Sequence, residues 1–236
     1  HLSIRRQRQM CIRDRYNAML IADVSDVAVS DINAAAMNVG AYKGVQVGLP
    51  YVLKGVVLFR NAAIIAEPAT DFADLKTKAE AATAGDIYGA LLEIGGFFSF
   101  GHIYGLGGAL MTADGDPAFN SPEGLAWLEM LQDFKALGAD NWYNDNDVNL
   151  FKEGKVGMVI DGTWNLGDFS AALGDDLVVD AWPSDMSGFV QTGMIYLNYN
   201  SVGANLDAAK AFMGYLLSAE AQTAFYEADG AFIPSN

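Results

Sequence analysis

Two carboxylates are the first side chains of this sequence to consider for chemistry. Glu93 precedes a stretch rich in glycine and phenylalanine, and Asp161 follows an apolar run. Paired carboxylates hydrolyse glycosides when they stand roughly 5 to 9.5 Å apart, one as acid and the other as nucleophile or base. The sequence leaves this separation open, so a glycosidase-type enzyme stays an alternative. The chain has 29 acidic residues, and most of them must therefore serve the surface.

Other catalytic and metal-binding patterns are incomplete. Ser99 lies in Gly-Phe-Phe-Ser-Phe-Gly, one residue longer than the Gly-x-Ser-x-Gly elbow, and a Ser-His-Asp site would have to use His102. The segment that begins at Asp145 lacks the glycine and the glutamate of a calcium loop, so we interpret it as a solvated loop. Cys11 is the single cysteine, which excludes an internal disulfide. We expect no catalytic residue, no metal site and no cofactor.

Aromatic side chains are the more informative group. Phe97, Phe98, Phe100 and Tyr104 cluster in the glycine-rich stretch, and Trp164 follows a tight turn. A tryptophan on a turn exposes apolar surface to water unless it meets a partner. That partner is either the protein core or a ligand, and aromatic rings match the apolar C–H face of a pyranose. Composition alone favours neither alternative.

Composition and charge narrow the class of partner. Hydrophobic residues make up 52% and charged residues 18% of the 236 residues, which indicates a globular chain with a sizeable core. The net charge of −15 repels nucleic acid and anionic membranes, so we expect neither as a partner. The most apolar window, residues 87–110, holds seven glycines together with Glu93 and His102, which favours a buried helix after a loop over a membrane span.

Residues 1–15 differ from the rest of the chain. They contain five arginines and one acid, and they resemble translated adapter sequence at the edge of an assembled read. They lack the apolar stretch and the small-residue cleavage site of a signal peptide. We interpret them as an artefact or an unstructured arm and leave them out of the predicted fold.

Helix and strand patterns alternate along the remaining chain. Strands are predicted at 27–29, 45–49 (ended by Pro50), 55–59, 155–160 and 194–197. Helices are predicted after the cap Thr70, from Ser121 to Gly138, at 207–217, and at 218–228 with Ser218 as cap. This alternation indicates an α/β fold.

Several motifs occur in an order that carries a family resemblance. The longest is Phe151-Lys-Glu-Gly-Lys-Val-Gly-Met-Val-Ile-Asp-Gly-Thr-Trp164, and shorter ones lie at 24–27, 42–51, 193–201, 208–222 and 230–234. Together they resemble family 1 extracellular solute-binding proteins of the maltose-binding type, whose modules include F..GK.AM...G.W. Two positions depart from the pattern: Lys43-Gly44 reverses the usual order, and Asn61 lacks the lysine that normally follows.

The resemblance implies a two-lobed periplasmic-binding-protein fold of type II, a Venus flytrap that closes by a hinge around a ligand in the interlobe cleft. Lobe one would comprise residues 16–52 and 190–236, and lobe two residues 53–189. Counterparts of the family's first strand and helix and of its last helices are missing from the sequence. We therefore expect an internal fragment, incomplete at both ends.

The resemblance also assigns candidate ligand-binding residues in lobe two. Trp164 matches the stacking aromatic of that lobe, and Phe97 and Phe98 lie where another aromatic contact is common. Glu93, just before them, is a candidate acceptor for a sugar hydroxyl, because a carboxylate can accept hydrogen bonds from vicinal hydroxyls.

The other candidates lie at the first crossing between the lobes and after the first-lobe strand. Tyr51 and Lys54 stand beside the cleft at the crossing. Ser30 and Asp31 follow the strand at its carboxyl end, the edge where α/β sheets place ligands. The charged side chains of Asp31 and Lys54 suit a polyol, because such groups can accept or donate two hydrogen bonds with vicinal hydroxyls.

The implied function is that of the substrate-binding component of an ABC importer. It would capture a sugar or oligosaccharide, deliver it to the permease transmembrane subunits and catalyse nothing. The resemblance implies a bacterial monomer in the periplasm or outside the cell, with a lipid anchor on the full-length parent as an option. Three alternatives stay open: the same fold with a polyamine, organic anion or metal complex, an adhesion or sensing module, and the glycosidase-type enzyme.

Overall fold

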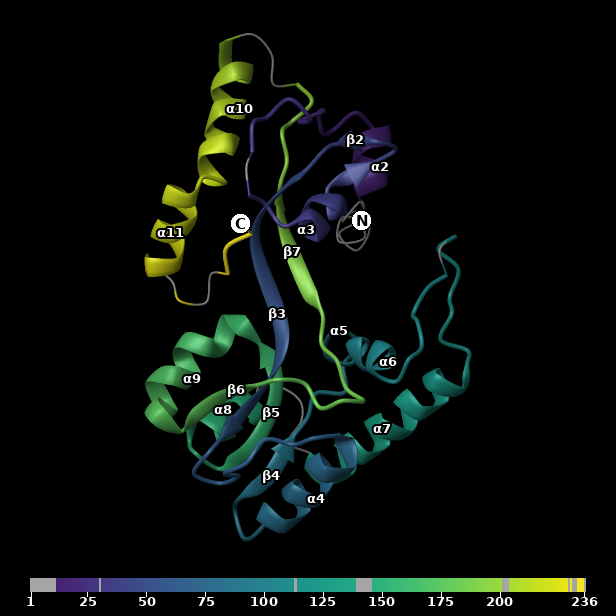
Figure 1. Cartoon of the computed structure of the whole chain (residues 1–236), viewed down its shortest axis with the longest axis vertical. Helices are drawn as coiled ribbons and strands as arrows, with labels where there is room; N and C mark the ends of the chain where they lie inside the picture. The colour runs from purple at the N-terminus through teal and green to yellow at the C-terminus, as the bar shows by residue number, and fades with distance from the viewer. Residues whose placement is uncertain are drawn as a thin grey trace, which may run out of the picture. The chain divides into compact units, whose positions relative to one another are not determined.

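The chain divides into two compact units. The computed structural model describes residues 12–29, 31–112, 114–138, 146–200, 204–228, 230 and 233–235. Unit 1 combines His1–Lys54 with Gln191–Asn236, and unit 2 is Gly55–Val190. The chain passes between them in strand β3 (Leu49–Asn61) and at the start of β7 (Val190–Ile195) (Figure 1). The sequence analysis sets these boundaries slightly earlier, after residues 52 and 189.

A mixed sheet forms the centre of unit 2. Strands β4 (Tyr88–Leu91), β5 (Val156–Gly162), β3 and β6 (Leu177–Asp180) lie in that order, and β7 also pairs with β3. β4 and β5 are parallel, whereas β5 and β6 both run antiparallel to β3. Every residue of β5 is buried, which explains why its sequence is an almost continuous apolar run.

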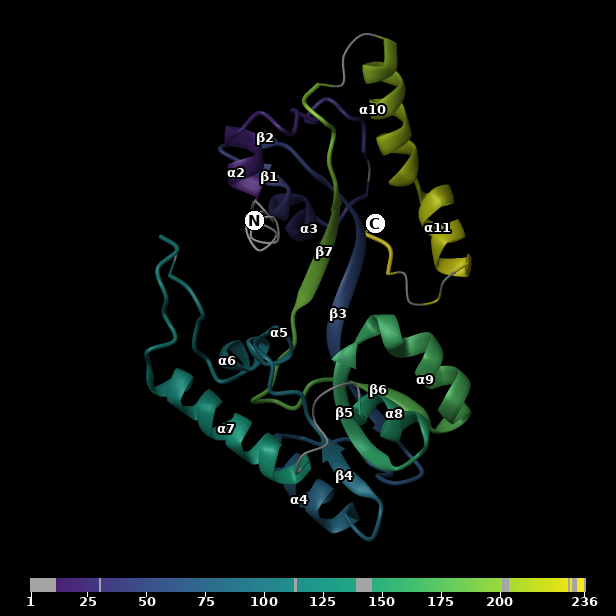
Figure 2. The same cartoon turned by 180° about the vertical axis from the view of Figure 1, so that it is seen from behind.

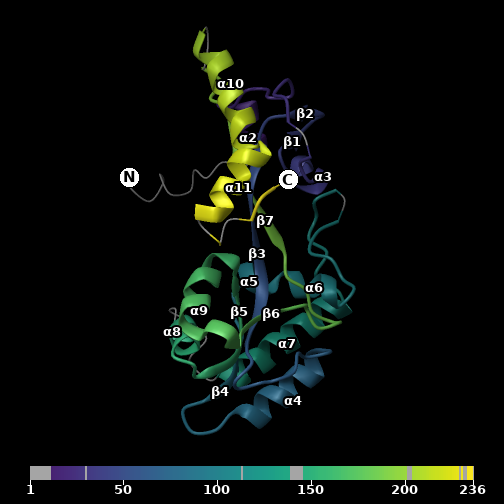
Figure 3. The same ribbon diagram turned by 60° about the vertical axis from the view of Figure 1, so that its left-hand side comes forward.

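Successive residues of these strands point to opposite faces of the sheet, and each face has its own core. Met158 and Ile160 of β5 pack in one cluster with Phe134, whereas Val159 packs in a second cluster with Phe169. The first cluster is completed by helices α4 (Phe72–Ala82) and α7 (Pro122–Gly138). The second is completed by α8 (Asn146–Lys152) and α9 (Leu166–Leu173), which lie on the other side of the sheet (Figure 3).

The helices of the first face begin at capping side chains. The Ser121 hydroxyl caps α7 as predicted, accepting a hydrogen bond from a backbone N–H at 3.2 Å. The cap of α4 is Asp71 and not Thr70, because Asp71 Oδ1 accepts the N–H of Asp74 at 2.8 Å. Thr70 instead donates its own N–H to the Asp74 carboxylate at 3.0 Å. Both starts follow the rule that a short polar side chain satisfies a free N–H of the first turn.

The apolar window 87–110 is not one buried helix. It contains strand β4 and then the short helices α5 (Gly96–Ser99) and α6 (Gly101–Gly105). A strand buried inside a sheet is as apolar as a buried helix, so hydrophobicity alone does not separate them. Within the described ranges, no helix combines the length and the apolar character needed to cross a membrane.

The predicted solvated loop after Asp145 is also corrected by the structure. Helix α8 begins at Asn146, and Asp147 is only 2% exposed. Residues 144 and 145 lie outside the described ranges. The 3₁₀ turn η2 (Gly174–Asp176) completes this half of unit 2 and leads into β6.

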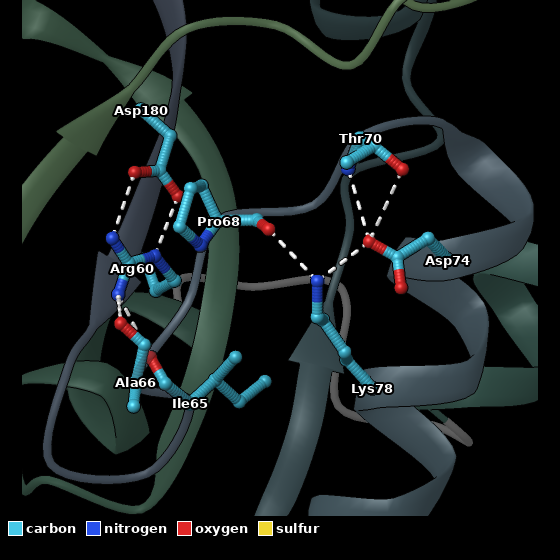
Figure 4. A network of polar contacts seen from close by, with 8 residues as sticks. All are labelled: Arg60, Ile65, Ala66, Pro68, Thr70, Asp74, Lys78 and Asp180. Atoms are coloured by element: carbon cyan, nitrogen blue, oxygen red, sulfur yellow. Dashed lines mark hydrogen bonds and ion pairs between the residues drawn. The ribbon is translucent and has the colours of Figure 1, made fainter.

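A buried ion pair joins β6 to β3. Arg60 donates through Nε and Nη2 to the two carboxylate oxygens of Asp180, at 2.7 and 3.0 Å, and both side chains are 5% exposed (Figure 4). The same guanidinium donates through Nη1 to the carbonyls of Ile65 and Ala66, both at 2.8 Å. Lys78 of α4 donates to a further carbonyl of this loop at 2.8 Å. The network therefore fixes both the sheet edge and the loop that leads to α4.

The core of unit 1 contains residues from both of its chain segments. Val24 and Leu49 pack with Leu197, Met213 and Leu217. Its helices and hairpin are α2 (Ile12–Asn17), α3 (Ala34–Val39), β1 (Ala41–Tyr42) with β2 (Val45–Gln46), α10 (Ala204–Leu216) and α11 (Ala219–Ala228). Figure 2 shows α10 and α11 on one side of β3 and β7, and the β1–β2 hairpin on the other.

Gln222 of α11 connects the last described residues to β3. Its Nε2 donates to the Tyr51 carbonyl at 3.0 Å, and its Oε1 accepts the N–H of Ser235 at 2.9 Å. The Ser235 hydroxyl donates to the carbonyl of Pro50 at 2.8 Å. Gln222 and Ser235 are each 1% exposed, so their polar groups are satisfied inside the protein. This gives a structural role to the glutamine that ends the motif at 208–222.

The structure corrects two strand predictions in unit 1. Pro50 does not end a strand but stands at the second position of β3, and the predicted strand 55–59 belongs to that same strand. A proline is tolerated there because it withdraws only one donor near the beginning of the strand. Residues 27–29 are not a strand, since the N–H of Val27 bonds to the carbonyl of Val24 in a turn.

Two further boundaries move towards the N-terminus. β7 begins at Val190 and not at residue 194. The segment 1–15 is not unstructured at its end, because α2 begins at Ile12 and the rings of Tyr16 and Tyr42 pack edge to face at 5.7 Å. Residues 1–11 lie outside the described ranges.

Candidate ligand-binding site

Trp164 stands on the turn that ends β5. The strand ends at Gly162 and the 3₁₀ turn η1 (Thr163–Asn165) follows. The buried Asp161 carboxylate accepts the N–H of Gly162 at 2.5 Å and Nδ2 of Asn165 at 2.7 Å. Thr163 Oγ1 accepts a backbone N–H of β3 at 3.1 Å. These hydrogen bonds fix the backbone on both sides of Trp164 and so determine the position of its Cα atom.

The indole of Trp164 folds back over Gly162. A Cβ at Gly162 would lie 2.1 to 2.2 Å from three carbons of the six-membered ring. Real atoms do not approach so closely, so any other residue at this position must push the ring away. This accounts physically for the glycine two positions before the tryptophan.

We expect Gly162→Ala to displace the Trp164 ring. The backbone angles of Gly162 (φ −89°, ψ 154°) are ordinary for alanine, so the cost arises from the clash alone, about 1 to 3 kcal/mol of unfolding free energy. Urea unfolding in a Trp164→Ala background should show almost no cost, because the clashing ring is gone. Gly167→Ala, at an open and exposed position of α9, is the control and should be neutral or slightly stabilising. An equal cost in both backgrounds would contradict the packing described.

Trp164 belongs to a cluster of aromatic rings in unit 2. The ring of Phe97 lies 5.2 Å from that of Phe98, 6.0 Å from that of Trp164 and 4.9 Å from that of Phe189. Phe98 and Trp164 are 6.2 Å apart. These separations and the tilted or edge-on angles are those of favourable aromatic contacts. The structure thus brings together the three aromatic residues singled out in the sequence.

The rings of this cluster are partly buried and partly exposed to solvent. Phe97 is 42% exposed and Trp164 is half-buried, whereas Phe98 packs against the core. Glu93 is half-buried, and a Cβ on Gly95 would lie 3.6 Å from its Oε2 and 3.9 Å from Cδ2 of Phe98, so the carboxylate and the Phe98 ring flank Gly95. An exposed ring face next to a carboxylate can contact an apolar face and a hydroxyl of one small molecule at once.

Phe189 is the member of the cluster that the sequence analysis missed. It lies immediately before the second crossing, and its carbonyl accepts the N–H of Val56 in β3 at 3.0 Å. The Phe97–Trp164 cluster therefore stands at the end of unit 2 where the chain leaves it. The sequence signal that could have identified Phe189 was the presence of an aromatic residue at the predicted lobe boundary.

Asp31, Tyr51 and Lys54 lie in unit 1, although the predicted bounds put Lys54 in lobe two. Asp31 is exposed and has a left-handed backbone (φ 61°), which asparagine and aspartate tolerate better than most residues. Tyr51 is half-buried against the core of unit 1, and Lys54 is exposed at the last position before unit 2. Ser30 lies outside the described ranges. The structure places these side chains in a different unit from the aromatic cluster.

Asp161, Ser99 and His102, which were considered for catalysis only as an alternative, have structural roles. Asp161 supports the Trp164 turn, and the Ser99 hydroxyl donates to a backbone carbonyl at 3.4 Å. His102 is fully buried, with the rings of Phe134 and Trp182 at 5.5 and 5.2 Å. Its Nδ1 accepts a backbone N–H at 3.3 Å, so Ser99 and His102 do not form a nucleophile–base pair. Among the described residues, no group of acidic, histidine or cysteine side chains could hold a metal ion.

Burial makes His102 a determinant of acid stability. Desolvation lowers its pKa from 6.5 to about 4, and the hydrogen bond from Ser187 opposes this only in part. The unfolded chain therefore binds one more proton than the folded chain between pH 6.5 and 4. The unfolding free energy should fall with decreasing pH in this window, by up to about 1.4 kcal/mol per pH unit.

Urea unfolding at pH 7 and pH 5 of the wild type and of His102→Gln measures this contribution. Asp26, Asp74 and Glu123 are hydrogen-bonded carboxylates whose pKa values are lowered. They change the unfolding free energy with pH only below the interval between pH 7 and pH 5. We expect the glutamine variant to lose most of the pH dependence between these two values. An unchanged pH dependence in the variant would contradict the assignment to His102.

The architecture is the α/β fold of periplasmic binding proteins, as predicted. The GacH receptor of Streptomyces glaucescens GLA.O, solved unliganded and in complex with acarbose, matches with a TM-score of 0.80 and 24% identity over 95% of this chain and 63% of its own. A solute-binding protein of an ABC transporter from Thermotoga lettingae TMO, bound with alpha-D-tagatose, matches with a TM-score of 0.79 and 21% identity over 94% of this chain and 64% of its own.

The chain belongs to the bacterial extracellular solute-binding protein family, whose sequence model matches residues 13–236. The maltotriose-binding protein of Pyrococcus abyssi is 26% identical over 190 residues, which cover 73% of this chain and 40% of that protein. The chain thus spans less than two thirds of the length of these relatives. The family consists of binding proteins and not of enzymes, so the glycosidase alternative is set aside. The match also includes the end of the arginine-rich segment that the sequence analysis leaves out.

Proposed function

We propose that this chain binds a sugar or an oligosaccharide at the aromatic end of unit 2, with Trp164, Phe97 and Phe98 as the stacking surface. The observation that carries the proposal is the half-exposed ring cluster with the Glu93 carboxylate beside it. Such a surface matches the C–H face and the hydroxyls of a pyranose. Relatives that are named for maltotriose, or solved with tagatose and acarbose, support the same ligand class.

The transport role is part of the same proposal. The protein would be the substrate-binding component of an ABC importer, and it would deliver its sugar to permease subunits from the periplasm or the cell exterior. Membership of an extracellular solute-binding family supports this location and this role. The interlobe position of the ligand and the contributions of Asp31, Tyr51 and Lys54 rest on the sequence resemblance.

A thermal-shift screen of the full chain tests the ligand class. The panel contains maltose, maltotriose, D-tagatose, spermidine, citrate and an amino-acid mixture. A ligand present at 100 times its Kd should stabilise the folded chain by about 2.7 kcal/mol, which moves the unfolding temperature by several degrees. We expect shifts with sugars only. A shift with spermidine alone would favour the polyamine alternative, for which an aromatic cluster beside a carboxylate is also suitable.

A further inference from the structure

The segment that presents Phe189 to the aromatic cluster lies along the helical segment that carries Phe97. Phe100 keeps helical dihedral angles (φ −58°, ψ −28°), so α5 (Gly96–Ser99) and α6 (Gly101–Gly105) continue one another. Residues 185–189 belong to no helix or strand and lead into β7 (Figure 2). The separation of 4.9 Å between the rings of Phe97 and Phe189 therefore depends on how these two segments are held together.

Two glycines of α6 allow residues 185–189 to approach the helix closely. A Cβ on Gly105 would lie 2.5 Å from the carbonyl carbon of Met186. A Cβ on Gly101 would lie 2.5 Å from the carbonyl oxygen of Ser187. Both neighbours are backbone atoms, which cannot rotate away as the end of a side chain can, so a larger residue at either position must push the segment off the helix.

The two segments run in opposite directions in a regular register. The facing residues are Gly105 with Asp185 and Met186, Gly101 with Ser187 and Gly188, and Phe97 with Phe189. Eight residues of helix rise about 12 Å, and four residues of chain span at most about 13 to 14 Å. The segment must therefore be almost fully extended, so a displacement beside either glycine also moves Phe189.

His102 holds the middle of this segment against α6. Its Nδ1 accepts the N–H of Ser187 at 3.3 Å, and the imidazole is fully buried against the ring of Phe134. The ends of the segment are held by other elements. The Asp185 carboxylate accepts a backbone N–H of α4 at 2.8 Å, and the Phe189 carbonyl accepts one of β3 at 3.0 Å. The imidazole therefore supplies a fixed acceptor between these two anchors.

We propose that α6 is the positioning element of the ligand site: its glycines and His102 hold Phe189 against Phe97, and this contact sets the affinity for sugar. The inference rests on the proposed function and adds to it residues that act through Phe189. The two rings meet edge to face at 82°, and Phe189 is half-buried where Phe97 is 42% exposed, so Phe189 supports the exposed ring. Binding groups must be held to within about 0.5 Å of their productive geometry.

Two substitutions of His102 separate the hydrogen bond from the packing of the ring. His102→Phe keeps a ring against Phe134 but has no acceptor for the N–H of Ser187, whereas His102→Asn keeps an acceptor oxygen near the position of Nδ1 but loses the ring. Titration calorimetry of the full chain with maltotriose should show a Kd roughly three- to tenfold higher in His102→Phe and within about twofold of the wild type in His102→Asn. Urea unfolding should show that His102→Asn is nevertheless the less stable variant.

Gly105→Ala tests the close approach of the backbone independently. The added methyl group should displace residues 185–189 and raise the Kd for maltotriose by roughly tenfold. Gly167→Ala, at the open and exposed position of α9, is the matched control and should leave the Kd unchanged. In a Phe189→Leu background, Gly105→Ala should raise the Kd little further, because the ring that α6 positions is already gone.

The outcomes separate this inference from the proposed function. An unchanged Kd in both His102→Phe and Gly105→Ala would overturn the positioning role and leave the proposed function standing. Equal losses of affinity in the two His102 variants, or fully additive losses with Phe189→Leu, would do the same, because they indicate a general role in folding. Absence of sugar binding by the wild type would overturn both. Circular dichroism shows whether each variant is folded, and His102→Leu provides a second test if His102→Phe does not fold.

Discussion

Replacing Trp164 by alanine is expected to weaken sugar binding by more than roughly tenfold. The centroid of the indole lies 6.0 Å from that of Phe97 and 6.2 Å from that of Phe98, and its removal takes away the largest ring of the cluster. Stability should change little, because Trp164 is half-buried and its turn is held by Asp161 and Thr163 and not by the indole. Titration calorimetry with maltotriose measures the affinity, and urea unfolding measures the stability.

Two variants control for this result. Trp164→Phe keeps a ring on the turn and should retain part of the affinity, whereas Trp182→Phe changes a tryptophan that packs against the core and should leave affinity unchanged. Equal affinity of the wild type and Trp164→Ala for every sugar tested would remove the stacking role. A loss of affinity that merely follows a loss of folded protein would do the same.

Replacing Asp180 by alanine is expected to lower the unfolding free energy by about 3 to 5 kcal/mol. The substitution leaves the Arg60 guanidinium charged and 5% exposed, with only two carbonyls to accept its five N–H donors. Because Asp180 is in β6 and Arg60 in β3, the edge of the sheet in unit 2 should lose its order first. Urea unfolding followed by circular dichroism measures the effect.

A surface ion pair of the same unit is the matched control. Lys152 and Asp168 are 3.0 Å apart, but their side chains are 37% and 67% exposed. Asp168→Asn should therefore cost less than about 1 kcal/mol. The double variant Arg60→Met with Asp180→Leu removes both buried charges and should recover much of the loss. A similar cost for Asp180→Ala and Asp168→Asn would contradict the importance given to burial.

Much of unit 2 could be predicted from the sequence because its signals are local. The capping serine at 121, the apolar run before Asp161 and the helical pattern that follows Pro122 all correspond to elements of the structure. These signals depend on residues a few positions apart. The turn before Trp164 was also predicted from its residues, and the structure adds a reason for the glycine at 162, which is its contact with the Trp164 ring.

The features that were missed depend on residues far apart in the sequence. Local sequence rules place the end of a strand at Pro50. Strand β3 nevertheless contains Pro50, because β3 and β7, the two segments in which the chain crosses between the units, pair with each other. Phe189 joins the aromatic cluster only because the end of unit 2 folds back beside β3. Leu125 and Leu128 follow the helical spacing but are 59% and 49% exposed, since α7 packs on the sheet through Met130 and Phe134.

Titration of the full chain with maltotriose and, separately, with spermidine tests the central claim most directly. If sugar binds at the Trp164 cluster, the heat released on titration with maltotriose should saturate at one ligand per chain. Titration with spermidine should give no binding heat. The sugar affinity should fall in Trp164→Ala and stay constant in Leu125→Ala. Saturable binding of spermidine together with no response to any sugar of the panel would contradict the account.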